Sequence, residues 1–140
     1  MKNELVGLKY IDIRNGLDLE DYYRTDLHWK QENLQDVVKI IQNGIGLDII
    51  EVNYDMENKG EFCGAYYGQL ATNVPPDNIY VLSNETIQNC TTYNFEKQKN
   101  APIYTETTSS DRYDIFLSGA TPIISIENPN ARNRQRIIIV

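Results

Sequence analysis

The short stretch at residues 22–30 (YYRTDLHWK) contains the only histidine and the only tryptophan among the 140 residues. A neutral imidazole is the usual general base near pH 7, and it needs an acceptor that holds its other ring nitrogen. Asp26 stands two residues before His28, so its carboxylate can reach that nitrogen across an extended backbone. The pair could therefore be the acid and the base of a Ser-His-Asp triad, in which the base activates a hydroxyl group.

Structural and metal-binding roles fit the same residues. Thr25 or Asp26 could cap a following helix, while His28 bonds a backbone carbonyl. Asp26 and His28 could also be two metal ligands, but the chain has no second histidine and no cluster of carboxylates to complete a coordination shell. We therefore predict no metal site.

A helix is predicted directly after this stretch. Its apolar residues recur at the spacing of one buried helical face, and they are Leu34, Val37, Val38, Ile41 and Ile45. The Asn-Gly pair at 43–44 is a typical helix end. His28 should lie in the first turn of the helix or just before it.

The remaining pattern predicts short strands separated by turns. Residues 47–52 fit either a strand or the end of a connection, and residues 53–60 a polar, exposed segment. We expect residues 79–82 to pair with 91–95 as an antiparallel hairpin. The other predicted strands are residues 8–13, 114–117, 122–126 and 137–140. The last of these has four β-branched residues in a row, which is typical of a strand buried on both faces of a parallel sheet.

The composition limits the classes of partner. The net charge of −7 disfavours nucleic acid and an anionic membrane surface. The sequence has no apolar run near the ~20 residues of a membrane span and no signal peptide. Cys63 and Cys90 allow one disulfide bond, and the sequence does not decide whether they pair.

Residues 22–29 resemble the motif of the DHHW protein family, with Leu27 in place of the first of the family's two histidines. They also resemble the Thr-Asp-x-His-Trp motif of alginate-type polysaccharide O-acetyltransferases, which are SGNH-hydrolase-like proteins. Residues 62–68, 76–79 and 116–119, followed by Pro122 and residues 126–128, look similar to the family as well. The resemblance therefore covers most of the chain.

This resemblance implies a role for several residues. Asp26 matches the triad acid and His28 matches the base. Arg24, Thr25 and Trp29 would support the site, with Trp29 acting by packing.

The resemblance also implies a serine nucleophile, in an Asp-Ser pair after a strand like 136–140. We therefore expect this chain to end before its nucleophile and to be inactive alone. Ser118, at the end of a predicted strand, is the best substitute within the chain. Gly119 is the candidate oxyanion donor. Ala120 stands where we expect relatives to have Asn, and a missing donor would cost a few kcal/mol of transition-state stabilisation.

For the fold, we predict one partial domain of the α/β class over residues 1–140. It would be SGNH-like (flavodoxin-like), with three layers, a partly parallel sheet, a truncated C-terminus and a loop-rich insertion at 53–112.

For the function, the resemblance implies an esterase or O-acetyltransferase that acts on bacterial cell-surface carbohydrate without a cofactor. Its substrate would be a polysaccharide or another acyl ester, outside the cytoplasm, and a membrane acyl donor would be a partner of the parent protein. The alternative is a non-catalytic carbohydrate-binding or structural domain, in which Tyr66 and Tyr67 stack on sugars.

Overall fold

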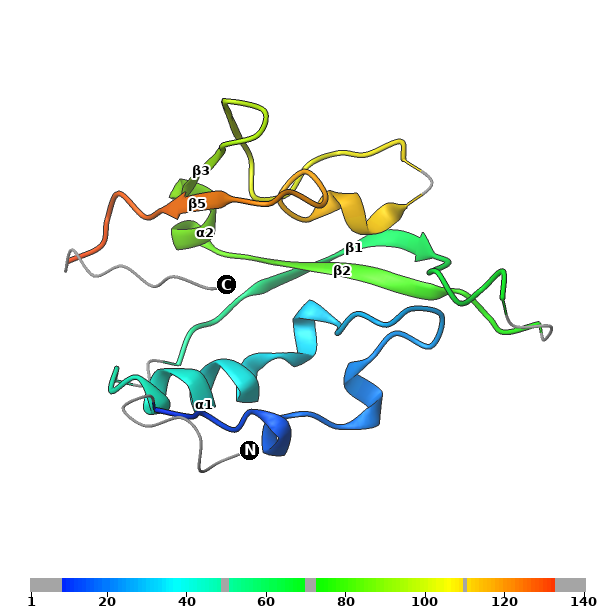
Figure 1. The fold of residues 1–140 in the computed structure, drawn as a ribbon, viewed down its shortest axis with the longest axis horizontal. Helices are drawn as coiled ribbons and strands as arrows, with labels where there is room; N and C mark the ends of the chain where they lie inside the picture. The colour runs from blue at the N-terminus through cyan, green and yellow to red at the C-terminus, as the bar shows by residue number, and fades with distance from the viewer. Residues whose placement is uncertain (1–8, 49–50, 70–72, 110, 133–140) are drawn as a thin grey trace. The chain divides into compact units, whose positions relative to one another are not determined.

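The computed structural model describes residues 9–48, 51–69, 73–109 and 111–132 (Figure 1). Its contacts divide the chain into two units, residues 1–82 and 83–140. The first unit is built around the two-stranded sheet β1-β2, and the second around a three-stranded sheet of order β4-β3-β5.

The main helix of the first unit is α1 (Gln35–Gly44), which confirms the predicted helix and its end at the Asn-Gly pair. A 3-10 helix, Gln31–Asn33, precedes it. The predicted cap is wrong, because the N-cap residue is Leu34 and its side chain makes no capping hydrogen bond. Thr25 and Asp26 lie well before the helix and make longer-range contacts instead.

The apolar face of α1 is only partly covered. Val37 is buried, whereas Val38, Ile41 and Ile45 are all exposed over more than a third of their surface. The segment around Arg14–Gly16 packs against the helix. Figure 1 shows this blue segment running beside α1.

The sheet of the first unit pairs β1 (Asp55–Phe62) with β2 (Asp77–Ser83). β1 occupies most of the segment predicted to be a polar exposed loop, and all of it except Phe62 remains partly or fully exposed. β2 confirms the predicted strand at 79–82, and its buried residues include Ile79 and Val81. The predicted pairing of this strand with 91–95 is wrong, because β2 pairs with β1.

The second unit begins with a short helix, α2 (Glu85–Asn89), whose N-cap Asn84 accepts a hydrogen bond from the Ile87 N–H. β3 (Thr91–Asn94) forms the centre of its sheet. The strand on one side is β4 (Lys99–Ala101), with Asn94 opposite Lys99.

On the other side of β3 lies β5 (Ile124–Glu127), with Asn94 opposite Ile124. The strand predicted at 114–117 is absent, since a 3-10 helix occupies Arg112–Ile115. The Asp111 side chain caps this helix by accepting from the Tyr113 N–H.

The predicted three-layer α/β fold with a partly parallel sheet is wrong for the part of the chain that the structure describes, because both sheets are antiparallel. Parallel strands need a crossover connection of a dozen or more residues, usually helical. β3 and β4 are instead joined by a short turn at 95–98, and residues 9–13 form no strand. The predicted strand at 137–140 lies outside the described residues.

Among the described residues, no helix combines the length and the apolar character that crossing a membrane requires.

Candidate active site

Residues 22–29 form a closed loop in the first unit. Tyr22 and Trp29 pair as an isolated antiparallel bridge, and their rings meet edge to face with centroids 6.2 Å apart. Inside this bridge, the Tyr23 N–H donates to the His28 carbonyl over 3.2 Å. The bridge therefore places the residues between 23 and 28 in a tight turn.

The Asp26 carboxylate bonds both the backbone and the imidazole ring of His28. Oδ1 of Asp26 accepts from the His28 backbone N–H over 3.0 Å and also bonds Nδ1 of the imidazole ring. An ionised carboxylate can only accept, so the proton of this second bond belongs to Nδ1. The lone pair of the neutral ring then lies on Nε2. Asp26 is only 8% exposed, whereas the His28 side chain is 44% exposed, so solvent reaches the ring.

The segment after β1 fixes the other side of Asp26. The Ala65 N–H donates to Asp26 Oδ2 over 2.9 Å. The Gly64 N–H donates to Thr25 Oγ1 over 3.0 Å, and the Tyr66 N–H donates to the Thr25 carbonyl over 2.9 Å. Three consecutive backbone amides therefore bind the Thr25-Asp26 dipeptide.

Gly64 is required for this approach. A Cβ atom at position 64 would lie 2.5 Å from the Thr25 carbonyl oxygen and would also collide with the side chain of Asp26. No side chain fits in that space, so the sequence of this segment is matched to the position of the carboxylate.

Asp77, the first residue of β2, anchors the loop through hydrogen bonds to Thr25. Its Oδ2 accepts from both the N–H and the hydroxyl of Thr25, over 2.9 and 2.8 Å. Arg24 donates through Nε to Asp77 Oδ1 over 3.4 Å and through a terminal nitrogen to the Pro76 carbonyl over 3.2 Å. Asp77 and Thr25 are both buried, so their hydrogen bonds have little competition from water.

Asp77 and Gly64 belong to the site although no local sequence pattern predicted it. Pro75-Pro76-Asp77 is typical of a turn, and the aromatic segment with Gly64 and Gly68 is typical of an irregular loop packed by its rings. The one available signal was that residues 62–68 and 76–79 look similar to the DHHW family.

The hydrogen bonds around the two aspartates decide their protonation. Burial raises the pKa of Asp26, but the N–H groups of Ala65 and His28 and the imidazole outweigh it, and the pKa falls below the ordinary 3.8. Burial likewise raises the pKa of Asp77, and the bonds from Thr25 and Arg24 reverse it, so that this pKa is lowered as well. Both carboxylates are therefore ionised at neutral pH.

These lowered pKa values predict a loss of stability in acid. A carboxylate with a lower pKa in the folded state contributes stability that is present above its unfolded pKa and is lost as pH falls through its folded pKa. We expect the free energy of unfolding to be level above about pH 5 and to fall below it. Urea denaturation at several pH values would measure this. In the Asp77→Asn variant the decline should be shallower, and an equally steep decline would contradict this origin.

The structure brings four of the predicted site residues together, namely Arg24, Thr25, Asp26 and His28, and Trp29 packs at the base of the same loop. Ser118 and Gly119 belong to the second unit. The Ser118 hydroxyl lies 2.9 Å from that of Thr105, and the Gly119 N–H donates to the Phe116 carbonyl over 3.0 Å. The catalytic roles predicted for Asp26 and His28, and those considered for Ser118 and Gly119, remain predictions.

Other chemistry-bearing groups do not converge. Within the described ranges, no three histidine, cysteine, aspartate or glutamate side chains gather in a way that could hold a metal ion. Cys63 and Cys90 are both free thiols.

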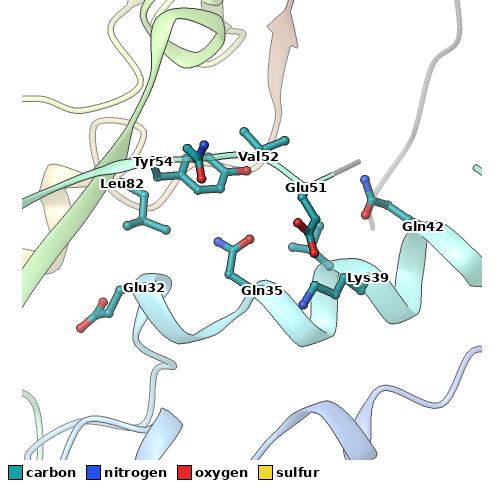
Figure 2. A pocket seen from close by; sticks show the side chains of 10 residues that line it. Glu32, Gln35, Lys39, Gln42, Glu51, Val52, Tyr54 and Leu82 are labelled. Atoms are coloured by element: carbon teal, nitrogen blue, oxygen red, sulfur yellow. The ribbon is translucent and has the colours of Figure 1, made fainter. Parts of the chain in front are cut away.

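A separate hollow of about 360 Å³ lies in the first unit between α1 and the segment before β1 (Figure 2). Figure 2 shows Gln35 and Lys39 of α1 on one side, and Glu51 and Tyr54 on the other. Neither Asp26 nor His28 lines this hollow. It is therefore distinct from the acid–base pair.

Comparisons with known proteins show that the chain is similar to a solved structure. It is the crystal structure of a DHHW family protein from Eubacterium siraeum, with a TM-score of 0.62 and 24% sequence identity. The match covers 80% of this chain and 41% of that protein, so the chain spans about two fifths of its length. No protein-family model and no curated protein matches the chain. The predicted resemblance is therefore confirmed as a likeness of fold: the chain is folded like a DHHW family protein.

Proposed function

We propose that Asp26 and His28 are the acid and the base of an acyl-ester hydrolase or O-acyltransferase that acts on carbohydrate. The observation that carries the proposal is the bond between the Asp26 carboxylate and Nδ1 of His28. This bond selects the tautomer and the orientation that a general base needs. The partial exposure of the imidazole adds support, because a substrate must reach the ring.

The proposed reaction moves one proton through His28. Nε2 takes the proton of a hydroxyl group while the hydroxyl oxygen attacks the acyl carbon, and the imidazolium forms beside the Asp26 carboxylate. Nε2 then returns the proton to the leaving alcohol as the tetrahedral intermediate collapses. A second hydroxyl, from water or from an acceptor sugar, releases the acyl group by the same route. Water would give hydrolysis and a sugar would give transfer.

The supporting shell keeps the carboxylate in place during this cycle. Ala65 and His28 each donate a backbone N–H to Asp26, and Asp77 anchors the adjacent Thr25. Groups held in this way lose little free energy to reorganisation when the imidazolium forms. The resemblance to the DHHW family suggests three further parts of the proposal. They are an acyl-ester substrate, a carbohydrate acceptor or donor, and a serine nucleophile outside the described residues.

Replacing His28 by glutamine tests the proposal. In the natural protein that carries this chain, turnover of p-nitrophenyl acetate and of an acetylated oligosaccharide should fall by roughly 10²–10⁴-fold, because the general base is lost. Asp26→Asn should also reduce kcat strongly, since an amide favours the wrong tautomer. The matched control is Leu27→Ala, an exposed position within the same loop, which should retain activity. Unchanged turnover in His28→Gln would overturn the proposal.

A second candidate function, sugar binding without catalysis, is favoured by two aromatic residues. Tyr66 and Tyr67 are 40% and 39% exposed, and the Tyr66 N–H binds the Thr25 carbonyl. Exposed tyrosine rings are suited to stacking on the faces of sugars. If this candidate is correct, Tyr66→Ala and Tyr67→Ala weaken binding of an oligosaccharide, while His28→Gln leaves that binding unchanged and no ester turnover is found.

A further inference from the structure

The apolar side of α1 is wider than a single packing contact requires. Five apolar side chains follow one another around the helix, in the order Val38, Ile45, Ile41, Val37 and Ile40. At about 100° per residue, they span a sector of roughly 160°. The apolar face of a helix that packs on one neighbour is typically about 100° wide. The helix therefore has apolar surface for a second contact.

The segment before the His28 loop covers one end of this sector. Val37 is 5% exposed. A Cβ atom at Gly16 would lie 2.8 Å from Ile40 Cδ1, and a Cβ atom at Gly44 would lie 2.5 Å from Ile11 Cδ1. These short distances show that residues 11–16 lie directly against this side of α1. The first contact of the helix is thus made within the first unit.

The other end of the sector is open. Val38, Ile41 and Ile45, which we call the α1 stripe, are 42%, 37% and 44% exposed. Residues three and four apart are neighbours on a helix surface, so the three side chains form one continuous stripe. Isolated apolar residues are common on protein surfaces, whereas a continuous apolar stripe with a polar border is typical of an interaction surface.

A polar border is present beside the stripe. Val38 lines the hollow between α1 and the segment before β1, and Val52, which is 44% exposed, lines the same hollow (Figure 2). The polar side chains around them include Gln35, Lys39 and Glu51. An apolar centre with a polar rim is the usual composition of a protein interface.

The size of the α1 stripe limits what can cover it. A stable complex between separate proteins usually needs about 20–30 residues a side, which is far more than the stripe and its border provide. A further part of the same polypeptide needs less area, because the covalent link gives it a high effective concentration. The similar DHHW structure indicates such a part, since the match covers 80% of this chain but only 41% of that protein.

We propose that the α1 stripe is the surface through which the first unit packs against a further part of the natural protein, outside these 140 residues. The contacting surface of that part is apolar and fits against Val38, Ile41 and Ile45, while Lys39 and Glu51 stay at the solvated rim. The proposal rests on the exposed face of α1 and is independent of catalysis by Asp26 and His28.

Cysteine labelling tests this proposal without any measurement of turnover. In a background with Cys63→Ser and Cys90→Ser, Val38→Cys or Ile41→Cys places one thiol on the stripe. Asn43→Cys is the matched control, because Asn43 is an exposed residue of the same helix outside the stripe. In the natural protein that carries this chain, we expect a maleimide to label the stripe thiols about 100-fold or more slowly than the control, since labelling requires local opening. In the 140-residue chain alone, all three thiols should react at similar rates.

Three results would overturn the proposal. The first is labelling of the stripe thiols in the natural protein as fast as that of Asn43→Cys, which would show an open surface. The second is protection already present in the 140-residue chain, which would show that the chain covers its own stripe. The third is protection that disappears on tenfold dilution, which would identify a second copy as the occupant. Since two stripe positions are tested, a variant that fails to fold at one position leaves the other to decide.

Discussion

Replacing Gly64 by alanine is expected to reduce the free energy of unfolding by about 3 kcal/mol, the upper part of the usual range for overpacking. The added Cβ would collide with Asp26 and with the Thr25 carbonyl, and neither can move easily. Thr25 is fully buried, and the backbone N–H groups of residues 64–66 already bind this dipeptide. To make room, the segment must withdraw and give up some of those bonds.

Urea denaturation followed by the fluorescence of Trp29 would measure this effect, since the only tryptophan lies in the affected unit. Gly68→Ala is the matched control. A Cβ at position 68 meets no atom within 4 Å, so this variant should be neutral or slightly stabilised. Equal stabilities of the two variants would show that the contact between residues 64–66 and Asp26 is absent in solution.

Replacing Asp77 by alanine is expected to cost about 3–5 kcal/mol. The substitution removes the acceptor of two buried Thr25 groups, its N–H and its hydroxyl, and it also removes a partner of Arg24. A buried donor that loses its partner carries the full cost of its desolvation. In addition, the loop that carries Asp26 loses its attachment to β2, so His28 should become more mobile.

Asn78→Ala provides the comparison for this second prediction. Asn78 is the next residue of β2 and is exposed, and its side-chain oxygen accepts a hydrogen bond from the Asn58 side chain over 3.3 Å. Its replacement should change stability by less than about 0.5 kcal/mol. The same urea experiment applies, and a loss of under 1 kcal/mol in Asp77→Ala would contradict the supporting role given to this carboxylate.

The sequence predicted the local features of the site better than its surroundings. The contact between Asp26 and His28 follows from a spacing of two residues, and α1 follows from the apolar periodicity at 34–45. The partners that complete the site come from 39 and 52 residues away, at Ala65 and Asp77. A pattern within a short window carries no information about such distant pairs.

The errors in the fold have a similar physical origin. Residues 55–62 lack the alternation of a half-buried strand, yet they form β1, because pairing with β2 satisfies their backbone groups while most of their side chains stay exposed. Residues 114–117 contain apolar side chains that suit a strand, but the Asp111 cap begins a 3-10 helix there. Tertiary pairing and local capping thus outweighed propensity in these two segments, and the part of the chain that the structure describes contains antiparallel sheets in place of the predicted partly parallel one.

The tautomer of His28 is the most direct test of the central claim, that Asp26 holds this ring as an oriented base. Long-range ¹H–¹⁵N correlation spectra of the chain with a neutral imidazole should show a protonated Nδ1, an unprotonated Nε2, and an Nδ1 proton shifted downfield by its bond to Asp26. In Asp26→Asn the downfield shift should be lost and the tautomer preference should change. If the ring instead carries its proton on Nε2, or if its spectrum is the same in Asp26→Asn, the account of this site is contradicted.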